Sequence, residues 1–167
     1  MRTMFKTATM TMAALALLAG GACGGKGGGG GGGSPEEVGK ALIDAANAQD
    51  AAAFKAIYPS KAALDAALEC PEGEGPWPKI EKELGKAEKN LEEIKGVTLE
   101  FVGFDASRNK EQKLAVGEEM KGCKAKAEVT VLRTRMKMKM TKDGKTEEEN
   151  EGLTLINLGG AWYLLDM

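Results

Sequence analysis

Apolar residues recur at helical spacing through the first part of the chain that follows a long glycine run. Ser34 is a good N-cap, Pro35 stands at the first helical position, and Glu37 completes a capping box. Asp50 and Ser60 stand where N-caps would begin two shorter helices. The pattern therefore predicts three helices in succession. Their apolar stripes are Val38, Ala41, Leu42 and Ala45; Ala53, Phe54, Ile57 and Tyr58; and Ala63, Leu64, Ala67 and Leu68, with Cys70 at the end of the third.

A longer helix is predicted from about Pro78 to Lys95. Its apolar residues are spaced by four and three positions, which places them in one seam on an otherwise charged helix. Gly96 follows as a C-cap. A coiled coil is the alternative, but the pattern spans only about two heptads, so we expect the seam to pack on a sheet. The seam consists of Ile80, Leu84, Ala87, Leu91 and Ile94.

The later part of the chain alternates apolar and polar residues with a period of two, as in antiparallel strands with one buried face. Strands are predicted at residues 97–101 and 123–131. Beyond Val131 the alternation inverts, and the apolar side becomes that of Leu132 and of three methionines. Either the long strand bends at a bulge, or its end projects past the core. The methionines are Met136, Met138 and Met140.

Asp143 and Gly144 mark a hairpin. A type I turn with Gly144 as the bulge residue would place three pairs of opposite charge across the two strands, each contributing about 0.2–1 kcal/mol. The predicted pairs are Lys139 with Glu147, Lys137 with Glu149, and Arg135 with Glu151. A second hairpin is predicted at Gly159-Gly160, and a last strand follows it.

Helices that come first and a meandering sheet that comes last predict an α+β fold, with N-terminal helices packed on a bent antiparallel sheet. The opening run Ser34 to Val38, the break at Ala45 to Asp50 and the closing run Asn157 to Leu164 resemble those of the NTF2-like superfamily. The resemblance is to its small bacterial lipoproteins of the DUF4878-like or SnoaL-like type, and it covers most of residues 34–167. It implies a cone-shaped fold that often holds a pocket between sheet and helices. A cystatin-like helix-on-sheet fold is the alternative.

The N-terminal segment has the order of a secretory signal. Arg2 and Lys6 precede an apolar stretch over residues 7–20, which is too short to span a bilayer as a helix. Small residues then lead to Cys23. The segment resembles the signal of bacterial lipoproteins, which implies that Cys23 becomes a lipid-modified mature N-terminus. An ordinary secretory signal with an incidental cysteine is the alternative.

The lipoprotein interpretation divides the chain into three parts. We expect a signal peptide at residues 1–22, a lipid-anchor cysteine with a glycine-rich tether at 23–33, and a single domain at 34–167. Two acyl signals on one cysteine are enough for stable anchoring. By the lipoprotein resemblance, Gly24 favours the outer membrane, facing the periplasm or the cell surface.

Composition narrows the possible chemistry. The chain carries 23 basic and 25 acidic side chains and no histidine. The absence of histidine excludes Ser-His-Asp and Cys-His catalysis and every imidazole general base. The basic residues are not in excess on any one face, so the composition does not indicate a nucleic-acid partner. No metal or other cofactor is predicted.

Two further cysteines bear on the compartment. Cys70 and Cys123 form an even pair in an exported protein, which predicts a disulfide. Two separate buried thiols are the alternative. The pair cannot complete a zinc site, because no further cysteine motif or histidine supplies the other ligands.

Candidate pocket residues come from the resemblance. NTF2-like enzymes place Asp, His or Tyr in the pocket, and Tyr58, Asp105 and Tyr163 are the candidates that this sequence offers. Each also has a structural interpretation, Asp105 as a turn residue at a strand end and the tyrosines as core aromatics.

The methionine row of Met136, Met138 and Met140 is a possible soft binding surface for a protein or a small apolar ligand. A copper(I) site is the alternative, but side chains two apart on a strand stand about 7 Å apart, too far for three thioethers to share one ion.

Two functions follow from these observations. In the first, the chain is a membrane-anchored envelope lipoprotein whose domain is a non-catalytic binding or structural module. In the second, it is an NTF2-like pocket enzyme of hydratase or isomerase type. The missing histidine favours the first.

Overall fold

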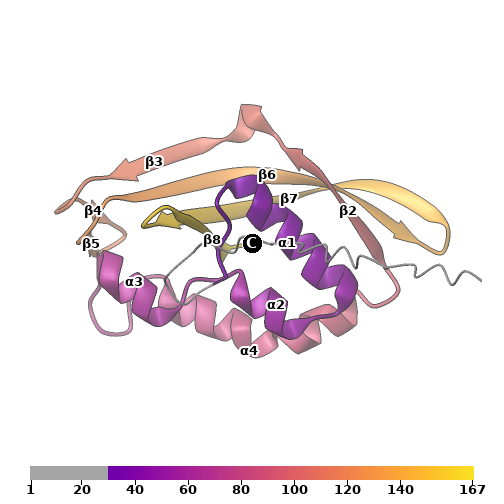
Figure 1. The fold of residues 1–167 in the computed structure, drawn as a ribbon, viewed down its shortest axis with the longest axis horizontal. Coiled ribbons are helices and arrows are strands. Elements are labelled where there is room, and N and C mark those ends of the chain that lie inside the picture. The colour runs from indigo at the N-terminus through magenta and orange to yellow at the C-terminus, as the bar shows by residue number, and fades with distance from the viewer. Residues whose placement is uncertain (1–29) are drawn as a thin grey trace, which may run out of the picture.

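The computed structural model describes residues 30–167, so the predicted signal peptide and Cys23 lie outside the described residues. The described part is an α+β fold, as predicted, in which a curved layer of long strands lies over the helices (Figure 1). None of its helices has the length and apolar character needed to cross a bilayer. In chain order the elements are α1 (Pro35–Ala48), α2 (Ala51–Ala56), α3 (Lys61–Ala67), β1 (Leu68–Glu69), α4 (Trp77–Glu93), β2 (Thr98–Phe104), the 3₁₀ turn η1 (Ala106–Arg108), β3 (Lys110–Leu114), β4 (Glu119–Met120), β5 (Cys123–Ala125), β6 (Val129–Lys142), β7 (Lys145–Leu158) and β8 (Ala161–Asp166).

The three predicted N-caps are confirmed. The side chains of Ser34, Asp50 and Ser60 each accept a hydrogen bond from an amide in the first turn of α1, α2 and α3. Glu37 differs from the predicted capping box, because its carboxylate accepts the amide of Gly33 at 2.6 Å rather than that of Ser34. The cap therefore ties the residues before α1 to its first turn.

The predicted seam on the long helix is also confirmed. Ile80, Ala87 and Leu91 of α4 are buried, and Leu84 and Ile94 are partly buried against the same core. Core residues also come from α1, α2, α3 and the central strands, so the seam joins a single hydrophobic cluster.

The strands form two antiparallel sheets. The larger has the order β2-β6-β7-β8 with β3 also paired to β6, and the smaller has the order β1-β5-β4. The prediction of one strand over residues 123–131 is wrong, because the chain changes sheets between Ala125 and Val129. There the amide of Lys126 donates to the carbonyl oxygen of Ala67 at 2.8 Å. The end of α3 thus takes up a backbone group that a continuous strand would need.

The β6–β7 hairpin has a different register from the predicted one. Its turn contains two residues, Asp143 and Gly144, with φ angles of 51° and 75°. Two positive φ angles define the type I′ turn, whose twist matches that of paired strands. The prediction of a longer type I turn is therefore wrong, and the predicted charge pairs are replaced by methionine–glutamate pairs. These are Met136 with Glu151, Met138 with Glu149, and Met140 with Glu147.

The large sheet is covered on both sides near its centre. Val131 pairs with Ile156 and Leu132 pairs with Leu155, and directly paired residues project to the same face. The two pairs therefore lie on opposite faces, named here the Ile156 face and the Leu155 face. All four side chains are buried. This double cover explains the inverted pattern, because β6 and β7 pair without any bulge.

Irregularities occur in the neighbouring strands instead. β2 has a bulge between Phe101 and Gly103, which leaves Val102 51% exposed. β8 has another, so that Leu164 pairs with Leu155 while Asp166 pairs with the preceding residue of β7. The β6–β7 hairpin itself extends past the helices at the right of Figure 1, as the second alternative predicted.

The residues just before α1 belong to the folded domain. Gly32 and Trp162 of β8 exchange two backbone hydrogen bonds, of 2.9 and 2.7 Å. A Cβ atom on Gly31 would lie 2.5 Å from Cε1 of Tyr163 and 2.7 Å from the carbonyl oxygen of Trp162. Gly31 and Gly32, which the sequence assigned to the tether, therefore lie against the edge strand, and at Gly31 the space admits only glycine.

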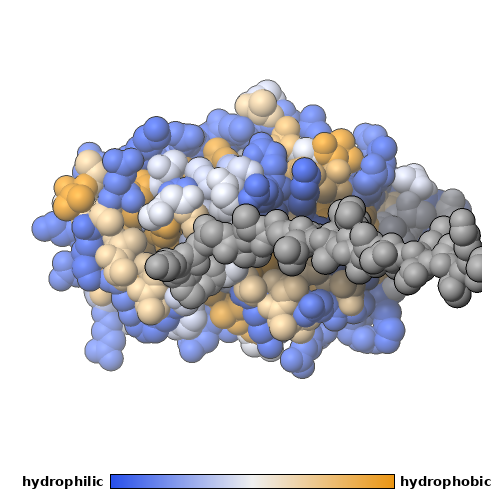
Figure 2. Space-filling view, viewed as in Figure 1, coloured by the Kyte–Doolittle hydropathy of each residue, from blue (hydrophilic) through white to orange (hydrophobic). Residues whose placement is uncertain are grey.

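Apolar surface is dispersed over the described part. Hydrophilic residues cover most of the outline of the face in Figure 2, and apolar residues lie between them. The large exposed hydrophobic side chains of residues 30–167 are Val102, Val116 and Met167. Single exposed apolar residues of this kind are ordinary, so they identify no interaction patch.

Candidate functional site

A partly open cavity of about 190 Å³ lies on the Ile156 face of the large sheet. Val131 and Ile156 form one row of its lining, and Arg133 and Thr154 form the next. Because the members of each row are directly paired, their side chains project to the same side. At the bulge in β8, Leu165 and Asp166 also line the cavity. This wall is apolar at Val131 and Ile156 and polar at the neighbouring row.

The small sheet and a loop form the opposite wall. Leu68 of β1, Met120 of β4 and Cys123 of β5 line the cavity together with Gly75 and Pro76. β1 and β5 are antiparallel neighbours, although they lie far apart along the chain. The cavity therefore forms between the two sheets and depends on the packing of the small sheet against the large one.

A disulfide joins the two strands of this wall. The Sγ atoms of Cys70 and Cys123 are 2.13 Å apart. The third helix ends at Ala67 rather than at Cys70, because Leu68 and Glu69 pair with β5. A Cβ atom on Gly75 would lie 2.6 Å from Sγ of Cys70, so the loop rests directly on the disulfide. The φ angle of Gly75 is +80°, which also favours glycine.

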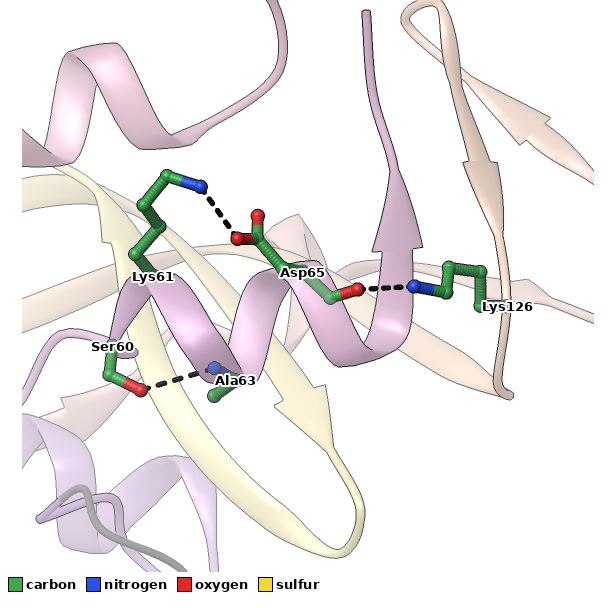
Figure 3. Close-up of polar contacts among 5 residues, drawn as sticks. All are labelled: Ser60, Lys61, Ala63, Asp65 and Lys126. Atoms are coloured by element: carbon green, nitrogen blue, oxygen red, sulfur yellow. Dashed lines mark hydrogen bonds and ion pairs between the residues drawn. The ribbon is translucent and has the colours of Figure 1, made fainter.

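Short polar contacts fix α3 beside this wall (Figure 3). Oγ of Ser60 accepts the amide of Ala63 at 3.1 Å, which caps the helix. Asp65 lies between two lysines: its carboxylate accepts Nζ of Lys61 at 2.6 Å, and its carbonyl oxygen accepts Nζ of Lys126 at 2.7 Å. Since Lys126 directly follows β5, the last contact joins α3 to the strand that carries the disulfide.

Three cationic side chains and one carboxylate line the cavity. Lys79 of α4 forms an ion pair with Asp166. Lys121 occupies the β4–β5 turn with a φ angle of 50°, and Gly122 follows at 79°. The third cation is Arg133. Within residues 30–167, neither Lys121 nor Arg133 takes part in an ion pair.

Tyr58, a predicted pocket residue, lies in the core rather than in the cavity lining. Its side chain is 3% exposed, and its ring centroid is 5.8 Å from that of Phe54. The hydroxyl has no hydrogen-bond partner among the described residues. Burial raises the pKa of Tyr58 above its usual range, and the charges of Glu83 and Asp166 raise it further. A hydroxyl held protonated in this way cannot serve as a base near neutral pH.

The other two predicted pocket residues are also outside the cavity lining. Tyr163 is buried and pairs with Ile156, and its ring lies against Gly31. Asp105 is the N-cap of η1, where its carboxylate accepts both the amide and the hydroxyl of Ser107. The hydrogen bond from the Ser107 side chain lowers the pKa of Asp105. All three predicted residues thus have structural roles.

The methionine row is only partly a surface. Met136 is 1% exposed and belongs to the core, so its assignment to a binding surface is wrong. Met138 pairs with Phe101 of β2 on one side and Glu149 of β7 on the other, and it is half-buried. The residues described here contain no cluster of three His, Cys, Asp or Glu side chains that could hold a metal ion.

Apart from Cys123, which was predicted as a disulfide partner, the cavity residues were not among the sequence candidates. The sequence did not single out Arg133, because its row partner Thr154 depends on the hairpin register. Lys121-Gly122 has the composition of a tight turn, and this was the one available signal. No protein-family model, curated protein or solved structure matches the chain.

Proposed function

We propose that this chain is a lipid-anchored lipoprotein of the bacterial envelope whose folded domain binds a small ligand without converting it. The cavity on the Ile156 face carries the binding part of this proposal. Its volume of about 190 Å³ exceeds the roughly 150 Å³ of an engineered apolar cavity that holds benzene. A mostly apolar lining with a few convergent polar groups is the usual character of a small-molecule site.

The polar groups of the cavity favour binding over catalysis. Its one carboxylate, that of Asp166, is committed to Lys79. General acid–base chemistry needs a titratable group within reach of the reacting atoms, and Tyr58, Asp105 and Tyr163 are elsewhere. No observation favours the hydratase or isomerase alternative.

The anchored location rests on the sequence at Cys23 and on the fold's compatibility with an NTF2-like lipoprotein domain. A Cys70–Cys123 disulfide fits export to an oxidising compartment. The pairing of Gly32 with β8 means that the tether joins the domain beside Trp162. An outer-membrane location, facing the periplasm or the cell surface, follows from the resemblance at Gly24.

The anchor is tested by the mass of the mature N-terminus. In a Gram-negative host, we expect the chain to begin at Cys23 and to carry a diacylglyceryl group and an amide-linked acyl chain. Cys23→Ser is the matched control and is expected to lose both the lipid mass and the membrane fraction. An unmodified Cys23, or cleavage at another residue, would contradict the anchor.

The cavity is tested by filling it. We expect the full chain to bind a benzene-sized probe, benzoate or benzyl alcohol, in isothermal titration calorimetry. Leu165→Trp places a larger ring into the cavity and is expected to weaken binding at least about tenfold, or 1.4 kcal/mol. Val102→Trp adds the same ring at an exposed bulge away from the lining.

The control variant should bind the probes as the unmodified chain does. No binding of either probe, or equal binding by Leu165→Trp, would show that the cavity is not a binding site. Thermal unfolding of both variants checks that they remain folded.

A further inference from the structure

We propose that the cavity selects small amphipathic carboxylates, with the carboxylate at Arg133 and Lys121 and the apolar body against Val131 and Ile156. This inference rests on the proposed function, because it names the ligand class of the same site.

The charge balance of the lining favours an anion. Asp166 is the single acidic group and is neutralised by Lys79. Arg133 and Lys121 form no ion pair among the described residues, although the carboxylate of Glu74 lies beside Gly122 in the same turn as Lys121. An anion that enters the cavity meets two positive charges, whereas a cation meets two repulsive ones.

Arg133 stands in a row of residues that offers it no free carboxylate. On one side it pairs with Lys110 of β3, and on the other with Thr154 of β7. Neither Lys110 nor Thr154 carries a negative charge that could pair with the guanidinium. The next residue in the row, Asp166, forms an ion pair with Lys79 instead. Elsewhere on the hairpin, Lys139 has acidic neighbours on both sides. Arg133 is thus a cation of the cavity lining without an acidic cross-strand neighbour, and Lys137, which pairs with Gly103 and Asn150 outside the lining, lacks one too.

The two cations have the chemistry that binds a carboxylate. A guanidinium offers a planar fork of donors that matches both oxygens of a carboxylate. Lys121 is held in the left-handed region by the β4–β5 turn, a conformation that is uncommon for a residue with a side chain. The turn therefore places Lys121 in the lining on the wall formed by the small sheet, whereas Arg133 lies on the wall formed by the large sheet.

The cavity has an apolar floor beside Arg133. Val131 is 3% exposed and Ile156 is fully buried, and they share a row next to Arg133. A ligand that places a carboxylate at Arg133 would lay its remaining atoms on this row. The volume accommodates about one aromatic ring or a short branched chain.

The test compares two probes of similar size and different charge, benzoate and benzyl alcohol, against the full chain in isothermal titration calorimetry. Benzoate is expected to bind at least about tenfold more tightly than benzyl alcohol. Arg133→Gln is expected to remove this preference by weakening benzoate binding more than benzyl alcohol binding. Arg135→Gln, two residues along the same strand and outside the lining, is the matched control and should keep the preference. Lys121→Gln serves as a second variant on the other wall and should reduce the preference.

Each outcome of the probe comparison tests a different part of the proposal. If both probes bind the unmodified chain equally, the selection of carboxylates is wrong while the cavity remains a binding site. If neither probe binds, the proposed function itself fails. If benzoate is preferred but Arg133→Gln and Lys121→Gln both keep the preference, the assigned residues are wrong and the inference is overturned.

Discussion

Removal of the Cys70–Cys123 disulfide is expected to lower the free energy of unfolding by about 4 kcal/mol. The two cysteines are separated by 53 positions, and closing a loop of this length restricts the unfolded chain by roughly that amount in the chain-entropy model. A single domain has a total stability of about 5–15 kcal/mol. The loss is therefore large enough to leave the variant marginally folded at 37 °C.

The native state also depends on this bond at the cavity. The disulfide joins β1 to β5, and the loop at Gly75 rests on its sulfur atoms. Opening the bond frees the wall that contains Leu68 and Cys123. We therefore expect weaker probe binding as well as lower stability.

Urea unfolding of the double variant Cys70→Ala/Cys123→Ala measures the effect without leaving a lone thiol. Cys23→Ser, which keeps the disulfide, is the control. A loss of less than 1 kcal/mol in the double variant would show that the bond has no role in holding the small sheet.

Replacement of Gly31 by alanine is expected to lower the free energy of unfolding by about 2 kcal/mol. A Cβ atom there would lie 2.5 Å from the ring of Tyr163 and 2.7 Å from the carbonyl oxygen of Trp162. Trp162 pairs with Asn157 of β7, so its backbone is not free to move away. The clash is relieved only if the segment lifts off β8. That movement breaks the two hydrogen bonds between Gly32 and Trp162, each contributing about 0.5–1.5 kcal/mol.

Gly33→Ala is the matched control in the same segment. Its Cβ atom would approach Oε2 of Glu37 at 3.3 Å, the movable end of a flexible side chain. We expect a change of less than about 0.5 kcal/mol. Urea unfolding gives both values, and hydrogen exchange at the Trp162 amide reports the lifting. Equal stability and equal protection in Gly31→Ala and the unmodified chain would mean that residues 30–33 are not seated on β8.

The helices could be predicted closely because their signals are local. Ser34, Asp50 and Ser60 act within one turn of the residues that they cap, and the seam of α4 follows from spacing alone. The α+β class followed from the order of the elements. Such features depend on residues a few positions apart, which the sequence displays directly.

The sheet was harder because its pairing depends on distant residues. The two-residue turn at Asp143-Gly144 shifted the hairpin by one position and moved every predicted partner. The break between β5 and β6 depends on the carbonyl of Ala67, which is remote in sequence. The backbone pairing of Gly32 with β8 brings together the two ends of the described chain. No local sequence pattern indicates such a contact.

The cavity could not be predicted for the same reason. Its walls meet only after β1 pairs with β5 and after the register places Arg133 beside Thr154. Tyr58, Asp105 and Tyr163 were chosen by residue type alone. In the structure, Tyr58 packs in the core, Asp105 caps the turn η1, and the ring of Tyr163 lies against Gly31. The prediction of a methionine surface is partly wrong, because Met136 is buried while Met138 and Met140 are half-exposed.

The central claim is that the cavity on the Ile156 face is the ligand site. It is tested most directly by an NMR titration of the ¹⁵N-labelled full chain with benzoate. We expect amide shifts to concentrate on the lining segments around Lys121, Arg133, Thr154 and Leu165, and to be absent in Leu165→Trp. Shifts spread over the surface, shifts confined to other elements, or no shifts at all would contradict the claim.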